Sequence, residues 1–127
     1  MIATAKPISL AMNEVQSVDD FSYAIRDYLD RFRESRDASL LRDEPPLLAE
    51  RLGDSGVADA WVAAVAESLA QEIGLPHPAW IHSSERRLSK PWFAAKSPKL
   101  KAILLQESPA AFRVRNLFVS ANALSRA

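Results

Sequence analysis

The sequence predicts a single compact all-α domain of four to six helices, two of them long, with a loop-rich and basic C-terminal part. Two long segments repeat apolar residues at the spacing of one helical face. Serine, proline and glycine stand at the ends of these segments and of several shorter ones, as they do where helices begin and end. With 127 residues, 48% of them hydrophobic, the chain is long enough for one domain with its own core.

The N-terminal residues carry the weakest pattern. Residues 1–16 show no sustained apolar period and contain Pro7. They predict an extended N-terminal arm, in which one short helical turn near Leu10 is the only candidate for regular structure. The helical domain is then expected to cover residues 17–127.

The first long helix is predicted to begin after Ser17, because serine is a favoured N-cap residue. Asp19 and Asp20 follow in the first turn, where carboxylates interact favourably with the helix dipole. We expect the helix to fray over residues 35–37. Its predicted buried face consists of Val18, Phe21, Ile25, Tyr28, Leu29 and Phe32.

The second long helix is predicted over residues 57–73, with Asp54 or Ser55 as its cap and Gly74 as its stop. It is rich in alanine, and small side chains let a neighbouring helix approach closely. Its predicted buried stripe consists of Val57, Trp61, Val65 (or Ala64), Leu69 and Ile73.

Shorter helices are predicted from the same residues that begin and end helices. Pro46 suits the first turn of a helix over 47–52, which Gly53 ends. Serine–proline pairs at 97–98 and 108–109 predict two more helices, because proline is favoured just after a cap. Before these two helices we expect an irregular connector over 79–96 with one turn at 84–88. After them we expect an unassigned segment at 117–119 and a terminal turn at 121–126. The predicted core is Phe21, Ile25, Tyr28, Leu29, Trp61, Val65, Leu69, Leu100, Ile103 and Leu104.

The charges of the chain are divided between its two parts. Residues 1–78 contain 7 basic and 14 acidic side chains, whereas residues 79–127 contain 9 basic and 2 acidic ones. The formal net charge of zero therefore hides an acidic part and a basic part.

Catalytic patterns are absent from the sequence. Without cysteine there is no disulfide, no thiolate metal site and no cysteine nucleophile. The three glycines stand at predicted helix ends, so they form no phosphate-binding loop. His77 and His82 could ligate a metal together with Glu85, but their spacing does not place both imidazoles on one helical face. We therefore expect no catalytic, cofactor-binding or metal-binding residues, and a protein that is not an enzyme.

The basic part combines cations with aromatic rings, which are both common at binding surfaces. Three other uses stay open. The rings could anchor a loop-rich core, and the cations could neutralise the acidic part. Arg113 and Arg115 could cap carbonyl groups or pair with carboxylates of the first long helix. The candidate partner-binding residues are Arg86, Arg87, Lys90, Trp92, Phe93, Lys96, Lys99, Arg113 and Arg115.

No stretch reaches the roughly 18–20 apolar residues that a membrane-spanning helix needs. The N-terminus also lacks a basic segment followed by an apolar run, as in a secretory signal. The expected location is therefore the cytoplasm, without membrane attachment.

Several motifs of this chain resemble the C-terminal region of small bacterial proteins in which it follows a helix-turn-helix DNA-binding domain. The resemblance covers roughly residues 18–127. Its clearest elements are Lys90-Pro91-Trp92-Phe93, Ser97-Pro98-Lys99-Leu100 and the tail from Glu107-Ser108-Pro109 through Asn116-Leu117-Phe118 to Ala127. Such proteins are often encoded beside a predicted minimal nucleotidyltransferase, in pairs that resemble toxin–antitoxin modules.

The resemblance implies a non-enzymatic antitoxin-like partner that binds and neutralises a nucleotidyltransferase-type toxin. Residues 1–16 leave no room for a DNA-binding domain, so direct regulation of transcription is not expected. The alternative is a nucleic-acid-binding or regulatory protein that uses the basic C-terminal face. A third possibility is a homo-oligomer in which acidic and basic parts of different copies pair.

Overall fold

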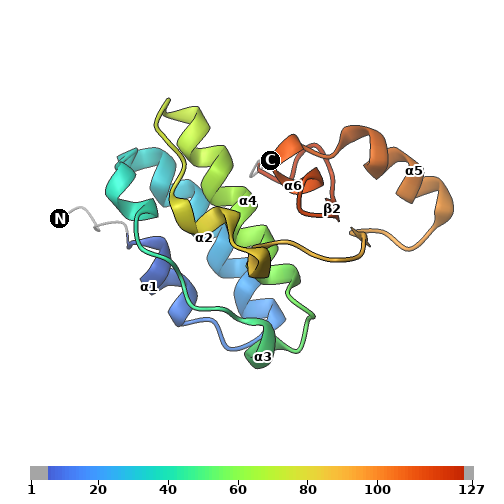
Figure 1. The fold of residues 1–127 in the computed structure, drawn as a ribbon, viewed down its shortest axis with the longest axis horizontal. Helices are drawn as coiled ribbons and strands as arrows, with labels where there is room; N and C mark the ends of the chain where they lie inside the picture. Colours follow the sequence, from blue (N-terminus) through green and yellow to red (C-terminus); the bar gives the residue numbers. More distant parts are fainter. Residues whose placement is uncertain (1–5, 125–127) are drawn as a thin grey trace.

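A computed structural model describes residues 6–124, in which six α-helices, three short 3-10 helices and one two-stranded parallel sheet are present. The prediction of a helical domain with four to six helices is confirmed (Figure 1). None of the helices in this range is both long and apolar enough to span a bilayer. The elements are α1 Ile8–Asn13, α2 Val18–Ser35, η1 Ala38–Leu41, α3 Ala49–Leu52, α4 Val57–Glu72, η2 Ala79–His82, η3 Ser84–Arg86, β1 Trp92–Phe93, α5 Pro98–Glu107, α6 Ala110–Arg113 and β2 Leu117–Phe118.

The prediction of an extended arm is wrong for residues 8–15, while residues 1–5 lie outside the described range. The expected turn near Leu10 is helix α1, which packs against α2. Ile8, Met12 and Val15 are at most 1% exposed. Ile8 and Met12 are four residues apart and share one face of α1, and Val15 follows just after the helix, so this segment belongs to the core.

Helix α2 follows the prediction closely. Its N-cap Ser17 accepts a hydrogen bond from the Asp20 N–H at 3.1 Å. All residues of the predicted apolar face are buried except Val18, which lies in the first turn and is 55% exposed. The helix ends at Arg36, whose positive φ of 53° turns the chain away.

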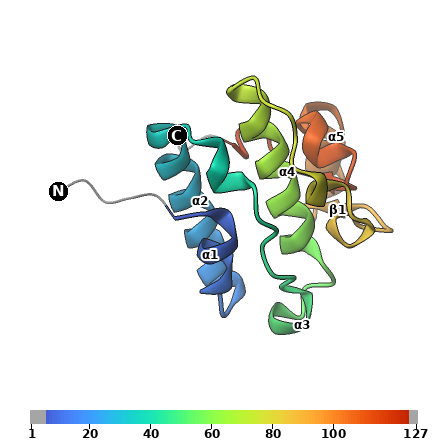
Figure 2. The same cartoon turned by 60° about the vertical axis from the view of Figure 1, so that its left-hand side comes forward.

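Helix α4 is the centre of the fold and lies between the α1–α2 pair and the C-terminal elements (Figure 2). The N-cap residue is Gly56, two positions after the predicted Asp54, whose carboxylate accepts from the N–H groups of Gly56 and Ala58. At the other end Gly74 adopts a φ of 68° and the Leu75 N–H donates to the Ala70 carbonyl, so the predicted stop is confirmed. Eleven of its 16 residues are buried.

The two short strands hold the C-terminal elements together. The parallel register pairs Trp92 with Leu117 and Phe93 with Phe118. The Trp92 N–H donates to the Asn116 carbonyl at 2.8 Å, and Asn116 has a φ of 64° that brings the chain into the strand. Helix α5 contacts β2 and projects from this end of the molecule (Figure 1).

Most of the predicted core is confirmed, but α5 is turned differently. Leu100 and Ile103 are 51% and 44% exposed, so their assignment to the core is wrong, and Trp61 is only half-buried. Residues 121–124 form the start of the expected terminal turn, and residues 125–127 lie outside the described range. The remaining core predictions, all buried, are Phe21, Ile25, Tyr28, Leu29, Val65, Leu69 and Leu104.

Candidate interaction surface

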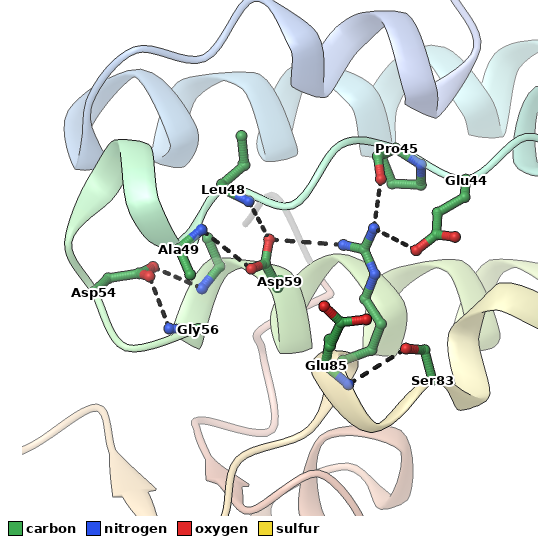
Figure 3. Close-up of polar contacts among 11 residues, drawn as sticks. Glu44, Pro45, Leu48, Ala49, Asp54, Gly56, Asp59, Ser83 and Glu85 are labelled. Carbon is green, nitrogen blue, oxygen red and sulfur yellow. Dashed lines mark hydrogen bonds and ion pairs between the residues drawn. The ribbon is translucent and has the colours of Figure 1, made fainter.

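Arg86 is part of the interior and cannot contact a partner, so its assignment to the partner-binding set is wrong. Its side chain is fully buried. Its Nη2 donates to Glu44 Oε2 at 3.1 Å and to the Pro45 carbonyl, and its Nη1 lies 3.7 Å from Asp59 Oδ1. Glu44 and Pro45 from the segment before α3 and Asp59 from α4 converge on this guanidinium (Figure 3).

Asp59 completes this buried cluster from the first turn of α4. Its carboxylate accepts from the N–H groups of Leu48 at 2.6 Å and Ala49 at 3.2 Å. Burial raises the pKa of the Asp59 carboxyl above its ordinary 3.8, although the Leu48 N–H and Arg86 both act in the opposite direction. The cluster thus fastens the chain before α3 and the η3 turn to α4.

Arg115 is likewise wrongly placed in the partner-binding set, because its side chain is only 4% exposed. Its Nη2 lies 2.9 Å from Glu67 Oε1 on α4. The same guanidinium donates to the carbonyls of Ala111 at 2.7 Å and Ile81 at 3.1 Å. For Arg86 and Arg115, the alternative that cations of the basic part neutralise carboxylates of the acidic part is therefore correct.

Trp92 and Phe93 leave β1 in opposite directions, as successive residues of a strand do. The Trp92 ring packs edge-on against the ring of Trp61 in α4, with the two ring centroids 6.2 Å apart. The Phe93 ring stacks on Phe118 at 5.0 Å, and Lys101 Nζ lies 5.4 Å from its centroid. Both rings are half-buried, so each packs in the fold while keeping one part of its surface open.

Arg113 acts as a carbonyl cap, which was one of its expected uses. Its Nη2 donates to the carbonyls of Gln106 at 3.1 Å and Ser108 at 3.2 Å, close to the end of α5. Its side chain is otherwise exposed. Arg113 therefore fixes the turn between α5 and α6 and still presents positive charge to solvent.

The exposed cations that remain are Arg87, Lys90, Lys96 and Lys99, together with Arg113. Two of them adjoin Leu100 and Ile103, which share one side of α5 because they are three residues apart. We call Lys96, Lys99, Leu100 and Ile103 the α5 face. Its two lysines were predicted as partner-binding residues, whereas Leu100 and Ile103 were predicted in the core.

A second feature was not predicted at all. A cavity of about 740 Å³ opens between α2 and α4. We call it the tryptophan groove, since Trp61 and Trp92 form one wall and α2 forms the other. The signal in the sequence was Val18, which continues the apolar face of α2 beyond the part that is covered. The groove residues used below are Val18, Phe21, Ile25, Asp54, Trp61 and Trp92.

The two histidines lie near each other, with ring centroids 6.3 Å apart. Within residues 6–124 no group of three histidine, aspartate or glutamate side chains is arranged to hold a metal ion.

Comparisons of the chain with models of protein families, with curated proteins and with solved structures gave no match.

Proposed function

We propose that this chain is a non-enzymatic protein-interaction module and that its α5 face is the docking surface. One observation carries the proposal: α5 has ten residues, of which only Leu104 is buried. The helix therefore contributes little to the core, while Leu100 and Ile103 stay 51% and 44% exposed. Apolar side chains gathered on a helix face beside cations are typical of binding surfaces.

The α5 face combines two kinds of attraction. Lys96 and Lys99 would speed the encounter with an acidic surface and orient the approach. Leu100 and Ile103 would supply affinity when they are removed from water, since each loses exposed apolar area in a complex. This arrangement favours a folded protein partner that has both acidic side chains and an apolar cleft.

The proposed partner is a nucleotidyltransferase-type toxin encoded next to this chain, which the chain would neutralise as an antitoxin in the bacterial cytoplasm. The support is the resemblance of residues 18–127 to the C-terminal region of antitoxin-like proteins. A nucleotidyltransferase active site holds metal ions with carboxylates, so the basic α5 face is suited in charge to occupy its entrance.

The test is coexpression with the product of the adjacent gene, followed by capture and a titration of the purified complex. Leu100→Asp should weaken the complex about 30-fold or more, because it places a charge in the apolar part of the contact. Leu10→Asp is a matched control, since Leu10 is 55% exposed on α1 at the other side of the molecule. Failure to form a complex at micromolar concentrations would contradict the proposal.

A nucleic acid is the alternative ligand of the same face. Burial of Arg86 and Arg115 removes two of the expected phosphate contacts, and the Phe93 ring is already stacked on Phe118. Both observations favour the protein partner. Binding of labelled DNA or RNA whose affinity falls steeply with salt would support the alternative instead.

A further inference from the structure

The tryptophan groove has the size and the lining of a small-molecule site. Its volume of about 740 Å³ lies within the range of pockets that enclose small ligands. Phe21 and Ile25 of α2 line one wall, and the rings of Trp61 and Trp92 line the other. Both tryptophans are only half-buried, and Val18, which also lines the groove, is 55% exposed. A bound molecule would remove this apolar and aromatic surface from water.

The two tryptophans of the groove also offer hydrogen-bond donors. The N–H of Trp80, which lies outside the groove, donates to the Leu41 carbonyl at 3.0 Å. No acceptor within residues 6–124 receives a hydrogen bond from the N–H of Trp61 or Trp92, whose rings contact each other edge-on. A ligand that carries acceptor atoms as well as apolar surface is therefore favoured over a plain hydrocarbon.

The charge that the groove can offer to a ligand is positive. Arg26 is a further lining residue, is exposed, and takes part in none of the ion pairs found within residues 6–124. The Asp54 carboxylate accepts from the Gly56 N–H at 3.0 Å through one oxygen and from the Ala58 N–H at 2.8 Å through the other. It lies beside the start of α4, where the helix dipole offsets negative charge. An anionic ligand can thus pair with Arg26, whereas a cationic ligand would find the carboxylate already engaged.

The remaining acidic residues of α2 lie outside the lining of the groove. Asp27 pairs with Arg31 at 2.9 Å, and the Asp20 carboxylate accepts from the Gln16 N–H at 3.0 Å. Charges that lie outside the site and face water are screened by salt, so they oppose an anion in the groove only weakly.

We propose that the tryptophan groove is a binding site for a small aromatic carboxylate. The carboxylate pairs with the Arg26 guanidinium, whose planar fork can donate to both of its oxygens. The aromatic part packs against the rings of Trp61 and Trp92, because ring pairs attract each other beyond the effect of buried area alone. The same attraction favours an aromatic body over a saturated chain. The groove shares no residue with the α5 face, so this site does not depend on the proposed function.

Titration with 2-naphthoate tests the site, and nuclear magnetic resonance follows the assigned N–H signals of the three tryptophan rings. The signals of Trp61 and Trp92 should shift, whereas that of Trp80 should stay in place because its N–H is bonded outside the groove. 2-Naphthamide has the same rings without the charge and should bind about 10-fold or more weakly. Decanoate has the charge without the rings and should also bind more weakly than 2-naphthoate.

Two arginines of α2 provide a matched pair of variants. Arg26→Gln should weaken the binding of 2-naphthoate about 10-fold or more and leave that of 2-naphthamide unchanged. Arg31→Gln is the control, because Arg31 belongs to the same helix but does not line the groove. Both arginines are exposed, so circular dichroism should show an intact fold for each variant.

Four results would overturn the inference. In the first, 2-naphthoate at millimolar concentration leaves the signals of Trp61 and Trp92 in place. In the second, Arg26→Gln and Arg31→Gln lower its affinity equally. In the others, 2-naphthamide or decanoate binds as tightly as 2-naphthoate, which would remove the role of the charge or of the rings, respectively.

Discussion

Helices α4 and α5 both contain many apolar residues but differ in how far they are buried. In α4 eleven of 16 residues are buried, and the helix contacts α6, η1, η2 and η3. In α5 one of ten residues is buried, and its close neighbour is β2. Apolar content alone therefore does not tell which helix builds the core. The number of elements packed around a helix decides it.

The cations of the basic part divide in the same way. Arg86 and Arg115 are buried and pair with carboxylates of the acidic part, including Asp59 and Glu67 of α4. Lys96, just before α5, and Lys99, in its first turn, stay exposed. Arginine is suited to the buried positions because its planar guanidinium can donate to several acceptors at once. The buried arginines thus stabilise the fold, and the exposed lysines give the α5 face its positive charge.

The largest expected difference between the two helices comes from the same substitution made in each. Leu69→Ala on α4 should lower the free energy of unfolding by about 3–4 kcal/mol, because Leu69 is fully buried and its removal leaves a cavity. Leu100→Ala on α5 should change it by about 0.5 kcal/mol or less. Urea unfolding followed by circular dichroism measures both. Similar losses at the two positions would show that α5 is packed as firmly as α4.

A smaller loss is expected when a buried cation is removed. Arg86→Met should lower the free energy of unfolding by about 2–3 kcal/mol, because it leaves the Asp59 carboxylate buried without its cation. Arg87→Met, at the exposed neighbouring residue, should have almost no effect.

The pH dependence of the Arg86→Met variant identifies the cause. Without the cation the pKa of Asp59 in the folded protein should rise further above 3.8. The free energy of unfolding should then fall as pH increases from 3.8 to the pKa of the folded state. The deficit should consequently shrink toward acidic pH. A deficit that is the same at acidic and neutral pH would attribute the loss to packing instead of charge.

The smallest expected effect concerns the two tyrosines of α2. Burial raises the pKa of Tyr28 well above its ordinary 10.0, and its hydroxyl donates to the Leu40 carbonyl at 3.0 Å. Above pH 10 the unfolded chain therefore loses this proton first, and stability should decline by up to about 1.4 kcal/mol per pH unit. Tyr28→Phe should remove this part of the decline and cost about 1 kcal/mol at neutral pH. Tyr23→Phe is the control, since Tyr23 is 83% exposed; equal alkaline profiles for the two variants would contradict the assignment.

Features set by nearby residues could be predicted from the sequence. The cap at Ser17, the Asp54 carboxylate before α4 and the stop at Gly74 act within a few residues of their helices, so the two long helices were placed correctly. Helix α1 was predicted only as a turn near Leu10 within an extended arm, although Ile8, Met12 and Val15 repeat at helical spacing, because Pro7 and the short length favoured an arm.

Features set by distant residues could not be predicted. The burial of Arg86 depends on Glu44, which is 42 positions away, and the exposure of Leu100 depends on how β2 orients α5. The tryptophan groove likewise forms only when α2, α4 and β1 come together. The exposed lysines of the α5 face could therefore be predicted from the sequence. The exposure of its apolar residues follows only from the tertiary structure.

The central claim, that α5 is held outside the core to bind a partner, is tested most directly by site-specific photo-cross-linking during coexpression with the adjacent gene product. A benzophenone amino acid is placed at position 103 or, as the control, at position 10. The account predicts a cross-linked complex from position 103 and none from position 10. A cross-link from position 10 with none from position 103 would contradict it.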